Sequence, residues 1–178
     1  MMAEEGIVSI AAAVQKAARQ MGVTERVGLP SESEVQLALK IYQRLFQADS
    51  QPQECRSLRQ AAVEIMCLLD RFSPWLVGAV LDGSANRFSR IELEMILGDA
   101  KQLEMFLLNA GIHFDIHNRR STSSQHKRTL TEVSFYELFL ADVAVWISLF
   151  PHNAARVSRS ANGLKHARLS EVEALLAA

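Results

Sequence analysis

Two carboxylates lie two residues apart in the apolar run 91–97, which reads Ile-Glu-Leu-Glu-Met-Ile-Leu. On a β-strand, side chains two residues apart point to the same face, so Glu92 and Glu94 are expected to lie together. Carboxylate oxygens are ligands that Mg²⁺ prefers. A turn formed by Gly83 and Ser84 precedes this run. Glycine lets a phosphate approach main-chain N–H groups closely, so the two features together could hold a phosphate against a divalent metal ion.

Such a site would suit phosphoryl or nucleotidyl transfer, in which positioning and charge neutralisation contribute most of the catalysis. Each feature also has a plainer interpretation. Asp82-Gly83 is a common turn sequence, and taken alone it favours an ordinary connection between strands. Glu92 and Glu94 could equally form the solvent face of a strand that packs Ile91, Leu93 and Met95 inward, and the pattern alone favours that interpretation.

Other reactive side chains form no recognisable set. His113 and His117 would lie about 13 Å apart along an extended strand, which is too far for one metal ion. Cys55 and Cys67 have no metal-ligand spacing and are expected to be reduced, buried thiols. Ser84 lacks the sequence context of a hydrolase nucleophile. We therefore expect no histidine or cysteine metal site and no serine hydrolase.

The composition is that of an ordinary globular protein. The chain has 178 residues, of which 49% are hydrophobic and 22% charged, and its net charge is −1. A near-neutral chain argues against a dedicated nucleic-acid binder without excluding one. The N-terminal residues lack the features of a signal peptide, and no apolar run approaches the length of a membrane helix. The sequence thus predicts a cytoplasmic protein without a membrane partner.

The chain divides into a helical part and a mixed part. Apolar residues recur with helical spacing in 3–20, in a helix that begins at Ser31 or Ser33 with a capping box to Glu34, and in 54–70. Strands are expected at 76–81, 91–97, 112–117, 129–138 and 143–150, with a helix at 99–109, a polar loop at 118–125 and a short helix at 169–177. We expect an N-terminal helical region, 1–70, and an α+β domain, 71–178, forming one unit.

The segment 72–117 resembles the nucleotidyltransferase superfamily. Its signature is an apolar strand, Gly-Ser, a loop with an arginine, and a strand that begins Ser-Asp-Ile-Asp-Leu. Gly83-Ser84 matches the Gly-Ser, Arg87 the loop arginine, and the segment 89–93, Ser-Arg-Ile-Glu-Leu, the carboxylate strand. The resemblance implies an α+β fold with a mixed β-sheet and flanking helices, preceded here by the N-terminal helices.

In active members, two strand carboxylates bind Mg²⁺ and a nucleoside triphosphate, and a third carboxylate activates the acceptor hydroxyl. By resemblance, Glu92 is the second carboxylate, Arg90 stands where the first belongs, and Asp142 is the nearest candidate for the third. Gly83, Ser84, Arg87 and Arg90 would contact the nucleotide. Because a cation in place of a metal ligand repels Mg²⁺, we expect a degraded catalytic site in a nucleotide- or partner-binding module.

Two alternatives remain open. The chain could be an active Mg²⁺-dependent nucleotidyltransferase whose metal ligands are Glu92 and Glu94, with Asp142 as a further catalytic carboxylate. It could instead be a non-catalytic assembly protein that forms a homo-oligomer through its N-terminal helices.

Overall fold

A computed structural model describes residues 10–22, 28–48, 50–122, 130–140, 142–151 and 166–177. Among these residues, three long helices come first, and a mixture of strands and helices follows. In chain order the elements are α2 (Ile10–Gln20), α3 (Glu32–Phe46), α4 (Gln51–Leu68), the short 3-10 helix η1 (Asp70–Phe72), β1 (Trp75–Val77), α5 (Gly78–Asp82), β2 (Ile91–Ile96), α6 (Lys101–Asn109), β3 (Phe114–Thr122), β4 (Leu130–Leu140), β5 (Val143–Phe150) and α8 (Leu169–Ala177).

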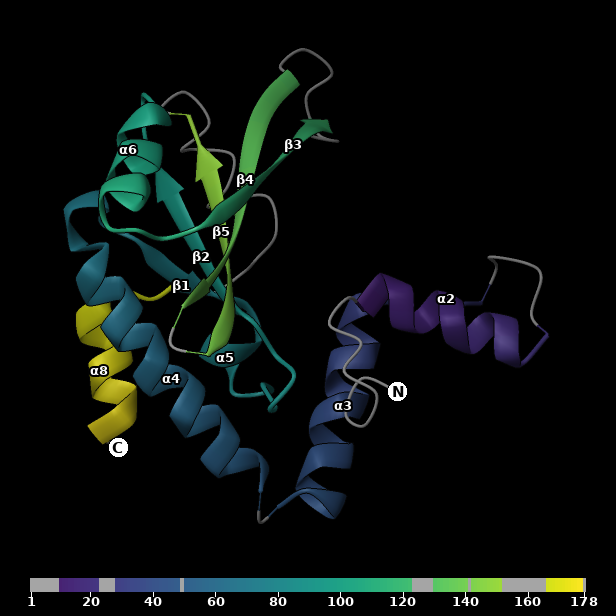
Figure 1. Ribbon diagram of the computed structural model, residues 1–178. Helices are drawn as coiled ribbons and strands as arrows, with labels where there is room; N and C mark the ends of the chain where they lie inside the picture. The colour runs from purple at the N-terminus through teal and green to yellow at the C-terminus, as the bar shows by residue number, and fades with distance from the viewer. Residues whose placement is uncertain are drawn as a thin grey trace.

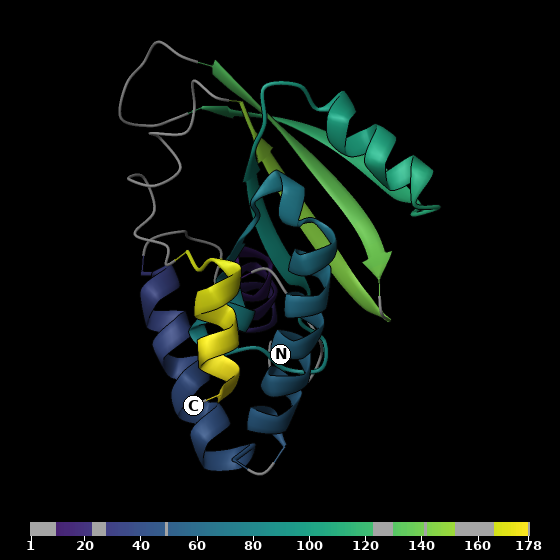
Figure 2. The same ribbon diagram turned by 90° about the vertical axis from the view of Figure 1, so that its left-hand side faces the viewer.

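The strands form one five-stranded mixed sheet in the order β1-β2-β5-β4-β3. Only β2 and β5 pair in parallel; the other neighbouring strands are antiparallel. The helices α4, α6 and α8 lie on one side of this sheet, and α2 and α3 extend away from it (Figures 1 and 2). The mixed sheet with flanking helices and preceding N-terminal helices confirms the predicted fold class.

The core lies between the sheet and these covering helices. In β2, buried residues alternate with partly exposed ones, so that Ile91, Leu93 and Met95 point inward. The parallel strand β5 repeats this alternation with Val145, Ile147 and Leu149. The covering helices contribute their apolar faces to the same core: Leu58, Ala62, Ile65 and Met66 of α4, Leu103 and Leu107 of α6, and Val172 of α8. The other face of β2 therefore carries Glu92 and Glu94.

The structure corrects the predicted strand at 76–81. β1 ends at Val77, and the residues that follow form the one-turn helix α5. Gly78 has a φ of +75°, which glycine tolerates and which turns the chain out of the strand. The apolar run misled the sequence interpretation because Leu76, Val77 and Val80 are all buried, in the strand and in the helix alike.

Other boundaries differ by less. The predicted polar loop 118–125 is wrong in its first part, because β3 continues to Thr122; residues 123–125 lie outside the described part. The predicted helix at 54–70 instead spans Gln51–Leu68, with Pro52 in its first turn, where proline is well tolerated. The predicted capping box is confirmed: the side chain of Ser31 accepts from the backbone N–H of Glu34, and the Glu34 side chain accepts from the backbone N–H of Ser31. Among the described residues, no helix is long and apolar enough to cross a membrane.

Candidate functional site

The Gly83-Ser84 turn caps helix α5 and does not connect two strands. Gly83 is the C-cap residue, with a φ of +84°. The N–H groups of Gly83 and Ala85 both donate to the carbonyl oxygen of Ala79, at 3.0 and 3.1 Å. The N–H group of Ser84 donates to Oδ1 of Asp82 at 2.8 Å. The three amides that could have received a phosphate are thus engaged in holding the turn itself.

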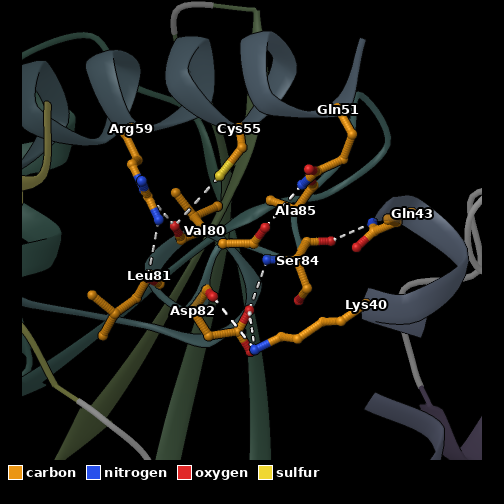
Figure 3. A network of polar contacts seen from close by, with 11 residues as sticks. Lys40, Gln43, Gln51, Cys55, Arg59, Val80, Leu81, Asp82, Ser84 and Ala85 are labelled. Atoms are coloured by element: carbon orange, nitrogen blue, oxygen red, sulfur yellow. Dashed lines mark hydrogen bonds and ion pairs between the residues drawn. The ribbon is translucent and has the colours of Figure 1, made fainter. Parts of the chain in front are cut away.

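Side chains from α3 and α4 bind the carbonyl groups of this segment (Figure 3). Gln51 donates to the carbonyls of Gly83 and Ala85, at 2.9 and 2.7 Å, and Gln43 donates to that of Ser84 at 2.8 Å. These carbonyl groups are largely shielded from water. The side-chain amides of Gln43 and Gln51 supply the hydrogen bonds that water would otherwise provide.

The end of α5 has a further partner in Arg59 of α4. Its guanidinium donates to the carbonyls of Val80 and Leu81, at 3.0 and 3.2 Å. A cation at the C-terminal end of a helix compensates the negative end of its dipole. The Cys55 thiol lies beside the same carbonyl of Val80, and burial raises the pKa of this thiol. The Cys55 thiol is thus buried, as the sequence predicted; the prediction of a buried thiol at Cys67 is wrong, because Cys67 lies on the exposed side of α4.

The glycine that directly follows the apolar strand is Gly78. A Cβ atom at Gly78 would lie 2.7 Å from Oε2 of Glu92, so the backbone of Gly78 lies directly against that carboxylate. The residues that directly follow strand β1 are therefore Gly78 and Ala79, and Gly83-Ser84 comes only after helix α5. Sequence reasoning missed Gly78 because it extended the strand through it.

Glu92 and Glu94 do share the outward face of β2, and each is paired with another side chain of the chain itself. Arg90 Nε donates to Oε1 of Glu92 at 2.8 Å. His166 Nε2 lies 2.8 Å from Oε2 of Glu94, and both of these side chains are less than one-fifth exposed. His166, 72 residues away in sequence, was not predicted as a partner, and no local pattern could have indicated it. The structure thus gives the two carboxylates separate partners.

Arg90 also stacks on an aromatic ring. Its guanidinium carbon lies 3.8 Å from the centre of the Trp146 indole ring, within cation–π distance. Trp146 is the residue of β5 that pairs with Glu92. His117 and Phe135 flank the same indole, with ring centres 6.3 and 6.2 Å from it. We call these residues with Glu92 the tryptophan face: Arg90, Glu92, His117, Phe135 and Trp146.

The structure does not bring Asp142 to this face. Asp142 lies in the tight turn between β4 and β5, with a φ of 61°, and its side chain is exposed. It precedes Trp146 by four residues, about 13 Å along an extended strand. Strand β5 itself contains no acidic residue, so the neighbour of Glu92 on this strand is an indole.

The partners of Arg87 are Glu54 and Phe88. Its backbone N–H donates to Oε2 of Glu54, and its guanidinium carbon lies 4.7 Å from the centre of the Phe88 ring. The turn that contains Arg87 is closed by Asn86, whose side chain accepts from the N–H of Phe88, and by Ser89, whose hydroxyl accepts from the N–H of Asn86. Within the described residues, no group of three or more histidine, cysteine or acidic side chains is placed to hold a metal ion.

Among known proteins, the chain is similar to several solved structures. No family model and no curated protein matches the chain. The structure of Cid1 in complex with the UTP analogue UMPNPP aligns at a TM-score of 0.42 and 13% identity, over 70% of this chain and 38% of that one. A cytoplasmic RNA terminal U-transferase aligns at 0.41 and 15%, over 66% and 35%. The chain thus spans well under half the length of the solved proteins to which it is similar.

Proposed function

We propose that this chain is a nucleotidyltransferase-like domain without a working metal site, and that it acts as a binding module. The observation that carries this proposal is the position of Arg90. It occupies the place of the first carboxylate in the signature, it binds Glu92, and it is held in place by Trp146. A guanidinium so placed supplies positive charge where Mg²⁺ would need negative ligands.

Two further features support the loss of catalysis. The amides of the Gly83-Ser84 turn are engaged in holding the turn itself, and strand β5 places Trp146, not an acid, beside Glu92. Metal-assisted transfer depends on several charges being positioned together. A single carboxylate that is already neutralised by an arginine supplies little of that charge.

The alternative is an active enzyme whose metal ligands are Glu92 and Glu94. It would require both carboxylates to exchange their present partners for a metal ion. Glu94 would have to leave His166, although both side chains are largely buried. Breaking a buried charged or hydrogen-bonded pair leaves the remaining group without its partner, which is unfavourable. The geometry therefore supports the binding module over the active enzyme.

A nucleotide, if it binds to the tryptophan face, is expected to do so without metal. Arginine is suited to phosphate oxygens, and a nucleobase can stack on an indole or on a guanidinium plane. Because Arg90 supplies the cation, removal of Mg²⁺ should leave such binding unchanged. The dependence on Mg²⁺ thus separates a binding module from an enzyme.

The test combines binding and transfer assays on the intact chain. Calorimetric titrations with the four nucleoside triphosphates, in Mg²⁺, Mn²⁺ or a chelator, should show no metal-dependent binding. Incubation with labelled triphosphates and cell lysate should show no transfer above the Glu92→Gln variant. Metal-dependent binding or transfer that the Glu92→Gln substitution abolishes would overturn the proposal.

A gain-of-function variant tests the role of Arg90 directly. Arg90→Asp restores the signature carboxylate next to Glu92, so it should bind Mn²⁺ more tightly than the wild type. The double variant with Glu92→Gln is the matched control and should lose this gain. Equal Mn²⁺ affinity in the wild type and in Arg90→Asp would show that Arg90 is not what excludes the metal.

A further inference from the structure

Helix α3 exposes apolar side chains while it contacts its own chain through polar ones. Leu37, Ile41 and Leu45 recur every four residues, and they are 62%, 52% and 68% exposed. We call these three residues the apolar row. In a surface helix the apolar stripe normally faces the core. In α3 the apolar row is instead exposed, while Val35, Leu39 and Tyr42 on another face are partly buried.

Two polar side chains of α3, Lys40 and Gln43, bind the segment at the end of α5. Gln43 is buried and donates to the carbonyl of Ser84 at 2.8 Å. The Nζ atom of Lys40 lies 3.8 Å from Oδ1 of Asp82. Figure 3 shows Lys40 and Gln43 with the segment that they contact. These contacts hold α3 against residues 82–84 and leave the apolar row exposed. The position of α3 is therefore specified by named contacts.

We propose that the apolar row is the interface of a homodimer, in which α3 of one copy packs antiparallel on α3 of a second copy. Residues spaced four apart form a ridge that packs into the corresponding groove of a second helix, the commonest mode of helix packing. Ile41 is the middle residue of the row, so a two-fold axis near Ile41 would place Leu37 of one copy beside Leu45 of the other. Such an interface is self-complementary, as a two-fold dimer requires.

Charges at the two ends of α3 select a second copy as the occupant. The first turn is acidic, with Glu32 and Glu34, and the last turn carries Arg44. In an antiparallel pair centred on Ile41, the acidic turn of each copy lies about one helical turn from the basic turn of the other, within reach of long side chains, and the two helix dipoles are opposed. Glu34 lies one helical turn before Leu37, in line with the row. It is therefore the acidic residue best placed to approach Arg44 of the second copy.

This inference is independent of the proposed function. The apolar row and the charges beside it include no residue of the tryptophan face. A monomeric protein could still be a binding module, and a dimeric one could still transfer nucleotides. The two proposals therefore fail in separate experiments.

The first experiment measures the mass of the full chain in solution as a function of concentration, by sedimentation equilibrium or light scattering. The wild type should be a dimer that dissociates on dilution. Ile41→Glu places a charge at the centre of the row and should shift the protein to monomer. Leu108→Glu, at an exposed leucine of α6 that is 67% exposed, is the matched control and should remain a dimer.

A second pair of variants tests the antiparallel orientation. Arg44→Glu opposes Glu34 of the second copy and should weaken dimerisation. Adding Glu34→Gln removes that repulsion and keeps a side chain that can complete the capping box with Ser31, so it should recover part of the lost affinity. Circular dichroism of every variant establishes that α3 is still folded.

Oxidative cross-linking gives a measurement that does not depend on disrupting the row. In a background with the exposed Cys67 replaced by serine, Ile41→Cys should form a disulfide-linked dimer, whereas Met105→Cys on α6 should not. A wild-type protein that is monomeric at every concentration would overturn the proposal. So would a dimer whose affinity is unchanged by both Ile41→Glu and Arg44→Glu.

Discussion

Gly78 and Glu92 lie against each other where β1 ends and β2 begins: a Cβ atom on Gly78 would meet Oε2 of Glu92 at 2.7 Å. The backbone of Gly78 has a φ of +75°, and the carboxylate is held on its other oxygen by Arg90. Two separate requirements thus favour glycine at this position, one from the backbone and one from the neighbouring side chain.

Gly78→Ala should destabilise the fold more than the same substitution at Gly111. Both glycines have a positive φ, but nothing lies within 4 Å of a Cβ at Gly111. The backbone strain is shared, so the difference in the free energy of unfolding reports the clash with Glu92, for which we expect about 1 kcal/mol. Urea titrations of both variants measure it. Adding Glu92→Ala should remove the difference, and its persistence would contradict this explanation.

Gln51→Ala should lower the free energy of unfolding by about 1–3 kcal/mol, because it removes the donor to the carbonyls of Gly83 and Ala85. Gln53→Ala, at an exposed position of the same helix, is the matched control and should change stability little. Chemical denaturation followed by circular dichroism gives both values. Equal effects at the two positions would mean that the bonds of Gln51 contribute nothing specific.

Stability should fall at alkaline pH through Tyr136. Burial raises the pKa of this hydroxyl well above its ordinary value of 10.0, and the hydrogen bond that it donates to Glu104 raises the pKa further. The unfolded chain releases this proton first, so the stabilisation is complete below pH 10.0 and declines as pH rises above it. Tyr136→Phe should flatten this decline, whereas Tyr42→Phe should not. Unfolding curves across the alkaline range decide between these outcomes.

Glu94 and His166 should be coupled in a double-mutant cycle. Their side chains are 2.8 Å apart and largely buried, and the C-terminal segment that carries His166 also forms a bridge between Ala167 and Leu76 of β1. Glu94→Gln, His166→Ala and the double variant should give a coupling of about 1–2 kcal/mol in the free energy of unfolding. Additive effects would show that the pair contributes no stability, and that Glu94 can be released at little cost.

Local patterns in the sequence predicted much of the architecture correctly. The alternation of apolar and acidic residues in 91–97 places Glu92 and Glu94 on one face, because the period of a strand is a local property. Ser31 and Glu34 predicted the start of α3, since a capping box involves residues only three apart. Most of the other helices and strands followed from the same kind of periodicity, whereas the mixed sheet was expected from the resemblance to the nucleotidyltransferase superfamily.

The tertiary structure alone decided what each candidate side chain contacts. The Gly83-Ser84 turn is closed because α5 precedes it and because α3 and α4 bind its carbonyls. Arg90 is fixed by Trp146, on a strand that pairs with β2 but lies more than fifty residues away in sequence. Strand pairing and helix packing bring such residues together, and the sequence of either segment carries no signal of the other. The periodicity of the sequence therefore determined on which face of a strand or helix each side chain lies. Long-range packing determined which residues that side chain contacts.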